Sequence, residues 1–208
     1  MDWSIVHSLN GFLYRSDPIE DPLLAYVQAA EALYLLLLVI LFLFARHERF
    51  TPVRRAAVAA GLSAGLGLLV VKIITEFYDR ARPFVAHPSA VHLFARHAAD
   101  ASFPSDHATA SMAIAVAFLL RRRFFWGVLT IVFAAILDFG RVAVGFHYPT
   151  DVLGGAAIGA LAAVVLWAPP LRKKVDALSD FVGGLWDRTL DAVLGRVRPA
   201  GVARPRSR

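Results

Sequence analysis

The chain has 208 residues, a formal charge of +6 and a hydrophobic content of 58%, which exceeds that of an ordinary soluble domain. It contains no cysteine, which excludes disulfides and thiolate metal sites. Its basic residues fall in short clusters between apolar runs, and this placement favours a lipid bilayer over nucleic acid as the partner of a single domain.

Apolar runs occupy most of the chain. Residues 3–13 carry apolar positions at roughly helical spacing and predict a helix on the membrane surface. Five longer runs follow, at residues 23–44, 56–74, 108–120, 124–137 and 152–168. A spanning helix needs about 20 residues, so the last three runs are marginal, and the third needs Ser105 to His107 as its first turn. The first run and the all-round apolar character of the others disfavour the alternative of a soluble helix bundle.

We therefore predict an all-α, polytopic transmembrane bundle of about five spanning helices with interfacial helices near both termini. The membrane domain is expected over residues 1–170, an amphipathic cytoplasmic helix over 171–197 and a disordered basic tail over 198–208. Close helix packing in lipid is expected where glycines lie four residues apart, in the pairs Gly61–Gly65 and Gly155–Gly159.

Charge sets the expected orientation. Basic residues cluster in three segments, at residues 46–55, 121–123 and after 171. If all five runs span, these segments share one side of the membrane, and the positive-inside rule makes that side the cytoplasm. The N-terminus and residues 77–104 and 146–150 would then lie outside. We expect a multi-pass cell-membrane protein with its N-terminus outside and its C-terminus in the cytoplasm.

The outer segments and the adjoining helix ends contain nearly all the polar residues that could carry chemistry. They are Arg80, Arg82, Ser105, His107, Arg141, His147 and Asp151. Guanidinium groups that lie together repel one another unless an anion joins them, and their planar fork suits phosphate oxygens. Free backbone N–H groups at a helix start beside Ser105 would add to such a site. Each residue alone also fits a structural role as a helix cap or an interfacial anchor, but the combination predicts a phosphate site.

Three motifs resemble those of the type-2 phosphatidic acid phosphatase family, and the resemblance covers about residues 72–155. They are Arg82-Pro83, then Pro104-Ser105-Asp106-His107, then Arg141, His147 and Asp151 at the family's spacing. Thr75, Asp106 and Gly140 stand where the family pattern has lysine, glycine and serine. The Arg-x-Arg-Pro-Phe and Ser-Phe-Pro-Ser-Asp-His forms are most similar to the bacitracin-resistance type of undecaprenyl-diphosphate phosphatase, where that lysine is not expected.

The resemblance implies a role for each residue. His147 is expected to attack phosphorus, and Asp151 to accept a hydrogen bond from the other ring nitrogen of His147. His107 is expected to protonate the leaving oxygen. Substrate binding is assigned to Arg82, Arg141, Ser105, Asp106 and, by our inference from its neighbouring position, Arg80 on a second phosphate. No metal or other cofactor is implied.

The expected function is the hydrolysis of undecaprenyl diphosphate to the monophosphate through a phosphohistidine at the extracytoplasmic face. Phosphatidylglycerol phosphate and phosphatidic acid are alternative substrates within the same family. A transporter is disfavoured because no repeated halves are evident, and a vanadium haloperoxidase is disfavoured by the spans. The expected partners are a lipid phosphate and the bilayer, without nucleic acid, and the oligomeric state is left open.

Other polar residues receive weaker interpretations. His87, His92 and His97 do not share a helical face, which favours a solvated outer loop over a metal site. Asp138 is expected to pair with Arg141 or Arg80, because an unpaired carboxylate at that depth is unfavourable. No role is assigned to Glu31 or Lys72.

Overall fold

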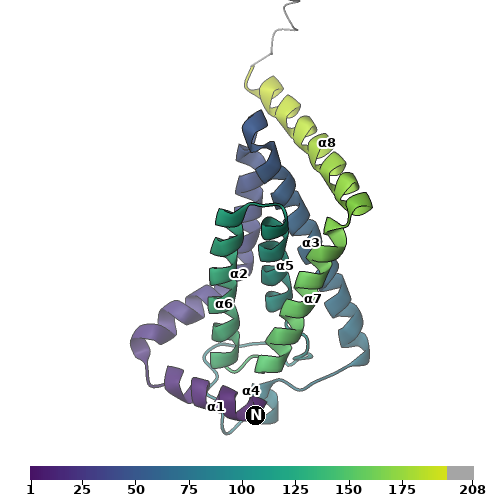
Figure 1. The fold of residues 1–208 in the computed structure, drawn as a ribbon. Coiled ribbons are helices and arrows are strands. Elements are labelled where there is room, and N and C mark those ends of the chain that lie inside the picture. Colours follow the sequence, from purple (N-terminus) through teal and green to yellow (C-terminus); the bar gives the residue numbers. More distant parts are fainter. Residues whose placement is uncertain (196–208) are drawn as a thin grey trace, which may run out of the picture.

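The computed structural model describes residues 1–195, and within that range the chain is helical without strands (Figure 1). Its helices are α1 (Asp2–Leu13), α2 (Asp17–Phe44), η1 (Glu48–Phe50), α3 (Thr51–Phe77), α4 (Pro83–Ala86), α5 (Asp106–Leu120), α6 (Phe124–Ala143), α7 (Pro149–Trp167) and α8 (Pro169–Val193). The all-α polytopic bundle predicted from the apolar runs is confirmed.

Four helices are long and apolar enough to cross a membrane, at Pro18–Phe44, Glu48–Phe77, Phe124–Ala143 and Pro149–Trp167. The fifth apolar helix, α5, has 15 residues and is shorter than a spanning helix needs to be. It packs against α3, α6 and α7, and most of its side chains are buried by them. Because its neighbours surround it, α5 does not need the length of a helix that faces lipid.

Helices α6 and α7 extend beyond the predicted apolar runs because their ends carry polar residues of the site. Arg141 lies in the last turn of α6, and Asp151 lies in the first turn of α7. The apolar pattern ends before each of these residues, whereas the helical backbone continues through them. Residues 144–148 form the short connection between the end of α6 and the start of α7.

One of the two glycine pairs brings helices into backbone contact. A Cβ atom on Gly155 or Gly159 of α7 would collide with the backbone carbonyl oxygens of Ser105 and Thr109. A Cβ atom on Gly65 of α3 would meet nothing within 4 Å. The prediction of close packing therefore holds for the pair in α7, which sets the start of α5 beside the start of α7, and it fails for the pair in α3.

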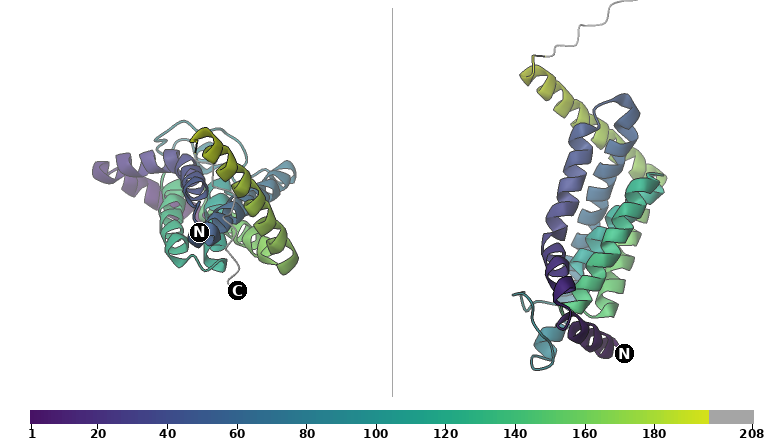
Figure 2. Two further views of the ribbon diagram at one scale, coloured as in Figure 1. Left: turned by 90° about the horizontal axis from the view of Figure 1, so that it is seen from above. Right: turned by 90° about the vertical axis from the view of Figure 1, so that its left-hand side faces the viewer.

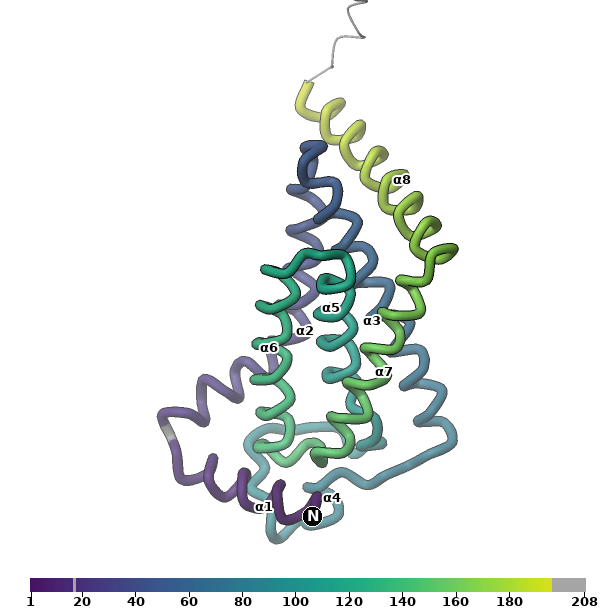
Figure 3. The backbone as a smooth tube through the Cα atoms, viewed as in Figure 1, coloured from purple at the N-terminus to yellow at the C-terminus, as the bar shows by residue number. Residues whose placement is uncertain are grey.

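Helix α1 and the long segment 78–105 cover one end of the bundle, which we call the α1 end (Figures 1 and 3). The buried side chain of Asn10 donates hydrogen bonds to the carbonyl oxygens of His92 (3.1 Å) and Ala143 (3.0 Å). It also accepts one from the His92 N–H at 2.8 Å. Asn10 thus fastens α1 to both the segment 78–105 and the end of α6.

Helix α8 lies at the opposite end, which we call the α8 end (Figure 2). Its aspartates form ion pairs with arginines that lie in the connections between helices or near the start of α3, in the pairs Arg46–Asp187, Arg46–Asp191, Arg54–Asp187, Arg55–Asp180 and Arg121–Asp176. The basic tail predicted over residues 198–208 and the last residues of the predicted amphipathic helix lie outside the described range.

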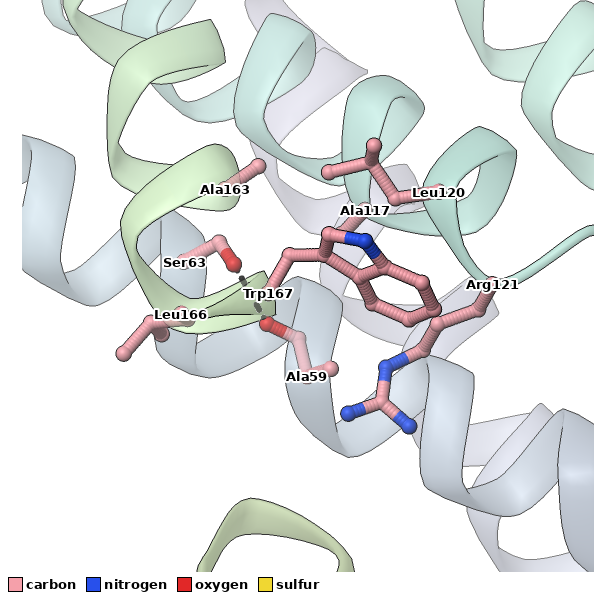
Figure 4. Close-up of a pocket in the computed structure, with 8 residues that line it drawn as sticks. All are labelled: Ala59, Ser63, Ala117, Leu120, Arg121, Ala163, Leu166 and Trp167. Carbon is pink, nitrogen blue, oxygen red and sulfur yellow. Dashed lines mark hydrogen bonds between the residues drawn. The ribbon is translucent and has the colours of Figure 1, made fainter. Parts of the chain in front are cut away.

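A small cavity near the α8 end is enclosed by α3, α5 and α7, beside Trp167 and Arg121 (Figure 4). Its volume of about 10 Å³ corresponds to about one water molecule. It is too small for a substrate.

Candidate active site

The candidate site forms where α5 and α7 begin, α6 ends and the segment 78–105 crosses the α1 end (Figure 3). After α6 the chain turns at Gly145, whose φ of +80° is readily adopted only by glycine. The N–H groups of Phe146 and His147 both donate to the carbonyl oxygen of Arg141, at 3.1 and 3.2 Å. This tight return places the side chain of His147 back over Arg141.

His147 is fully buried, and its contacts determine which ring nitrogen carries the proton. The guanidinium groups of Arg82 and Arg141 donate to Nε2 at 3.0 and 3.1 Å. Arginine can only donate, so Nε2 must offer a lone pair. On the opposite side of the ring, Nδ1–H donates to the carbonyl oxygen of Ser102 at 2.8 Å. The ring is therefore the neutral Nδ1–H tautomer, with an unprotonated Nε2.

The electrostatic surroundings keep this ring neutral. Burial, followed by the charges of Arg141 and Arg82, holds the pKa of His147 well below its ordinary value. A protonated imidazole cannot attack phosphorus, so the depressed pKa preserves the reactive form of the side chain.

Asp151 is fully buried but does not bond to His147, contrary to the hydrogen bond expected from the motif. Its Oδ2 atom lies 3.9 Å from Nδ1 of His147, beyond hydrogen-bond distance. Instead Oδ2 accepts hydrogen bonds from the Ser102 hydroxyl and from the Tyr148 N–H (2.8 Å). Asp151 caps α7 and fixes Ser102, and the Ser102 carbonyl in turn holds Nδ1. Ser102 is the first residue of the Ser-Phe-Pro-Ser-Asp-His form, but the sequence assigned it no role.

Arg80 lies on the same side of His147 as Asp151. It donates to Asp151 Oδ1 at 2.6 Å, to Thr150 at 2.7 Å and to Asp2 at 3.0 Å. Its guanidinium carbon also lies 4.0 Å from the centre of the Tyr148 ring. The structure thus places Arg80 behind the nucleophile, on the Nδ1 side, and not beside Nε2 with the other two arginines.

Arg82 and Arg141 differ in how their charges are balanced. Arg82 donates to the Asp100 carboxylate at 2.9 Å and to the Phe146 carbonyl oxygen at 3.0 Å. Arg141 is 3% exposed, forms no ion pair within the described residues, and its Nε–H has no hydrogen-bond partner there. A buried guanidinium without a carboxylate is costly, and a bound anion would remove that cost.

Asp138 does not supply the missing charge. It lies within ion-pair distance of neither Arg141 nor Arg80, and its Oδ1 atom has no hydrogen-bond partner in the described part of the chain. The prediction of this ion pair is therefore wrong. Arg80 donates instead to Asp2 and Asp151. Arg141 donates to His97 and His147.

His97 belongs to the site, although the sequence favoured a solvated loop. Its Nε2 atom accepts from Arg141 at 3.0 Å, and its ring lies 4.4 Å from that of Phe146. Burial, followed by the charges of Arg82 and Arg141, lowers the pKa of His97. His87 and His92 stack on Trp3 and Tyr14 of the N-terminal segment, each at 3.7 Å between ring centres. All three histidines thus fasten the segment 78–105 to the rest of the fold.

The start of α5 brings the remaining motif residues to the site. Ser105 is the buried N-cap, whose hydroxyl accepts from the Ala108 N–H and whose own N–H donates to the Asp151 carbonyl oxygen. Asp106 accepts from Nδ1 of His107 at 2.8 Å. The carboxylate of Asp106 also interacts electrostatically with Arg141 and His147, which places the second and third motifs around one region.

Residues 56–174 match the model of the PAP2 superfamily. The chain belongs to the PAP2 superfamily. This member is 36% identical over 159 residues to the undecaprenyl-diphosphatase BcrC of Bacillus subtilis, and the match covers 76% of this chain and 78% of the relative. It is 41% identical over 96 residues to the lipid A 1-phosphatase of Rhizobium johnstonii, which covers 44% and 38% of the two chains.

The crystal structure of LpxE from Aquifex aeolicus has the same fold, with a TM-score of 0.63 at 22% identity over 79% of this chain and 93% of that chain. Its likeness supports the arrangement of the helices in this PAP2 superfamily member. Membership of the superfamily, together with these relatives, identifies the chain as a multi-pass membrane lipid phosphatase and therefore as a hydrolase.

Two cavities of this PAP2 superfamily member share Asp106 and Leu68 as lining residues. The polar one, which we call the chamber, has a volume of about 570 Å³ and is lined by Arg82, Lys72, Thr75, Asp79, Asp100 and Asp106, among others. The apolar one, which we call the groove, has a volume of about 350 Å³ and runs between α2, α3 and α5. His107 and Glu31 line the groove together with aliphatic residues such as Leu35, Leu38 and Ile114. Glu31 thus faces a cavity and not a buried ionic partner.

Proposed function

We propose that this protein hydrolyses undecaprenyl diphosphate to undecaprenyl phosphate at the extracytoplasmic face, through a phosphohistidine on His147. The observation that carries the proposal is the convergence of two buried guanidinium groups on Nε2 of a neutral histidine. A terminal phosphate that enters this position would take over their N–H donors and lie against the free lone pair. Arginine forks stabilise the equatorial oxygens of a phosphoryl group as its charge redistributes in the transition state.

The reaction would proceed in two steps. Nε2 of His147 attacks phosphorus, the bond to the bridging oxygen breaks, and His107 gives its proton to that oxygen. The Ser102 carbonyl stabilises the positive charge that develops on the imidazole. Water then attacks the phosphohistidine, passes a proton to His107 and releases inorganic phosphate, which restores both histidines.

The in-line geometry of phosphoryl transfer changes the role expected for Arg80. The leaving oxygen lies opposite the attacking nitrogen, so the second phosphate extends away from the His147 ring. Arg80 lies behind that ring, where it bonds to Asp151. We assign it the role of orienting Asp151 in place of binding the second phosphate.

The substrate is proposed from the shape of the cavities and from the relatives. The chamber is a polar space beside Arg82, and the groove is an apolar space beside His107. A phosphate attached to a long hydrocarbon chain requires one space of each kind. The relative BcrC of Bacillus subtilis is named an undecaprenyl-diphosphatase. Phosphatidylglycerol phosphate and phosphatidic acid are the alternative substrates, because the pocket for their terminal phosphate would be the same.

The extracytoplasmic location is proposed from the distribution of charge. The arginine clusters at residues 46–55 and 121–123 lie at the α8 end, and the candidate site lies at the α1 end. The positive-inside rule therefore assigns the α8 end to the cytoplasm and the α1 end to the outside. Accessibility labelling of single cysteines at residues 89 and 173 in the cysteine-free chain would test this orientation.

The decisive experiment measures phosphate release from four substrates with one purified sample in detergent and chelator. The substrates are undecaprenyl diphosphate, undecaprenyl phosphate, phosphatidylglycerol phosphate and phosphatidic acid. We expect the highest kcat/KM with the diphosphate, no turnover by His147→Asn, and an acid-labile phosphoenzyme in the wild type alone. A higher kcat/KM for a glycerolipid would overturn the substrate, and a phosphoenzyme in His147→Asn would overturn the nucleophile.

A further inference from the structure

Asp106 is one of three aspartates that line the chamber, together with Asp79 and Asp100. A negative charge there repels a phosphate unless it serves another group. Its Oδ1 atom accepts two hydrogen bonds from the next residue, from the ring Nδ1–H of His107 and from the His107 backbone N–H, both at 2.8 Å. The carboxylate is thus folded back onto His107 and holds both its main chain and its ring.

This contact determines which nitrogen of His107 can exchange a proton with a substrate. An ionised carboxylate only accepts hydrogen bonds, so Nδ1 of His107 must carry a proton in every catalytic state. Nε2 is then the nitrogen that gains and loses a proton. His107 lines the groove, and the neighbouring Asp106 lines both the groove and the chamber, so the His107 ring lies in the groove next to a residue that both cavities share.

We propose that Asp106 is a positioning residue that holds His107 in the orientation and tautomer required of the general acid. The proposal rests on the phosphatase function proposed above. In the first step the bridging P–O bond breaks, its oxygen takes the proton from Nε2, and His107 becomes the neutral Nδ1–H tautomer bonded to Asp106. In the second step Nε2 takes a proton from the attacking water. Asp106 stays ionised throughout and compensates the charge of the imidazolium ion.

A purely structural role is the competing interpretation. Asp106 is the first residue of α5, and a carboxylate in the first turn stabilises a helix through its interaction with the N-terminal backbone. Such a role would affect the amount of folded protein and would affect all substrates alike. A positioning role acts only through His107, and only where the leaving oxygen needs a proton.

A double-mutant cycle separates the two roles. Phosphate release from phenyl phosphate, whose leaving oxygen needs a proton, is measured for the wild type, Asp106→Asn, His107→Gln and the double variant, with the unfolding temperature of each. A general acid contributes about 10²- to 10⁴-fold, and we expect Asp106→Asn to lose roughly 10- to 100-fold in kcat. In the His107→Gln background the same substitution should cost less than about twofold, because there is no ring left to position.

Asp79→Asn is the matched control, because it removes one negative charge from the same chamber without a hydrogen bond to a histidine. The change in kcat caused by Asp79→Asn should be the same in the wild type and in the His107→Gln background. A loss from Asp106→Asn that is equally large in the His107→Gln background would overturn the proposal.

The leaving group supplies a second readout. Phenyl phosphate releases a basic oxygen that needs a proton, whereas 4-nitrophenyl phosphate releases a stable anion that does not. We expect Asp106→Asn to lower kcat at least tenfold more with phenyl phosphate than with 4-nitrophenyl phosphate. Equal losses of kcat with the two substrates would show a structural role. Failure of the wild type to hydrolyse farnesyl diphosphate would instead contradict the proposed function itself.

Discussion

At the scale of single residues, the chemistry depends on His147 being buried, neutral and bonded on both sides. Two arginines donate to Nε2, and the Ser102 carbonyl accepts from Nδ1–H, so the ring has one permitted tautomer. Burial and the two positive charges disfavour the imidazolium ion. The arrangement keeps Nε2 of His147 unprotonated at the expense of the affinity of the ring for protons.

The neutral state of His147 can be tested through stability without any substrate. In the unfolded chain this histidine binds a proton below about pH 6.5, whereas in the folded chain its depressed pKa prevents protonation. Unfolding therefore takes up a proton below pH 6.5, and the folded state loses up to about 1.4 kcal/mol per pH unit as the pH falls toward the folded pKa.

We expect the unfolding temperature of His147→Gln to rise relative to that of the wild type between pH 7 and pH 5. The comparison cancels the contribution of His97, which titrates in both proteins. Parallel pH dependences of the two unfolding temperatures would show that His147 is protonated in the folded protein.

The indirect contact between Asp151 and His147 gives a second prediction. If Asp151 held Nδ1 directly, Asp151→Asn would favour the wrong tautomer and would cost about 10⁴ in kcat, as in a Ser-His-Asp triad. Because the Ser102 carbonyl holds Nδ1 instead, we expect a loss of only roughly 10- to 100-fold. Steady-state kinetics with farnesyl diphosphate measure the loss, and a value near 10⁴ would contradict the contact through Ser102.

The motif residues could be predicted from the sequence, but their mutual contacts could not. Arg82, Arg141 and His147 were found because apolar runs place them at helix ends on one side of the membrane. Ser102 and His97 lie in the segment 78–105, which has little regular structure and therefore no periodicity that reports a side-chain direction. Their roles follow from tertiary contacts alone.

At the scale of helices, the packing of α5 against α7 places the second and third motifs together. Gly155 and Gly159 let α7 approach the α5 backbone, and the Ser105 N–H donates to the Asp151 carbonyl oxygen at 3.0 Å. The lengths of α5, α6 and α7 were harder to predict than their existence, because polar residues of the site interrupt the apolar pattern before the helices end.

Substitutions of glycine by alanine should distinguish the effect of close helix–helix contact from the effect of helix propensity. Gly159→Ala places a methyl group against the Thr109 carbonyl oxygen, and we expect it to lower the unfolding temperature and the activity together. Gly65→Ala is the control, because its methyl group meets nothing within 4 Å and alanine favours a helix by about 0.5–1 kcal/mol. Equal unfolding temperatures for the two variants would contradict close packing of α5 and α7.

Helix α8 gives a prediction at the same scale. Asp187 pairs with both Arg46 and the buried Arg54, so Asp187→Asn leaves a buried guanidinium without its carboxylate. We expect a loss of about 1–3 kcal/mol in stability, against less than about 1 kcal/mol for Asp180→Asn, whose pair with Arg55 is exposed. Thermal unfolding in detergent measures both, and a larger effect of Asp180→Asn would show that α8 is not held through Asp187.

At the scale of the whole molecule, the charges and cavities divide the bundle into two functional ends. Ion pairs with α8 occupy four arginines of the α8 end, whereas at the α1 end Arg82 and Arg141 donate to His147 and Arg82 lines the chamber. The groove extends from His107 along α2, α3 and α5, so a hydrocarbon chain would lie between helices while its phosphate stays at the α1 end.

The length of the hydrocarbon chain should matter if the groove receives it. Gly65 lines the groove, and a larger side chain there would project into open space. We expect Gly65→Leu to raise the KM for undecaprenyl diphosphate at least several-fold more than the KM for isopentenyl diphosphate, whose chain ends near His107. An equal change in the two KM values would place the hydrocarbon chain elsewhere.

The enclosure of α5 has a consequence for biosynthesis. The ribosome delivers α5 to the membrane before α6 and α7, two of the three helices that bury it. Until α7 has been inserted, the short α5 lacks neighbours to shield its polar first turn, and His107 has no partner motif. A nascent chain arrested before residue 149 would therefore be anchored in the membrane but inactive, and catalytic competence would arise only with the last spanning helix.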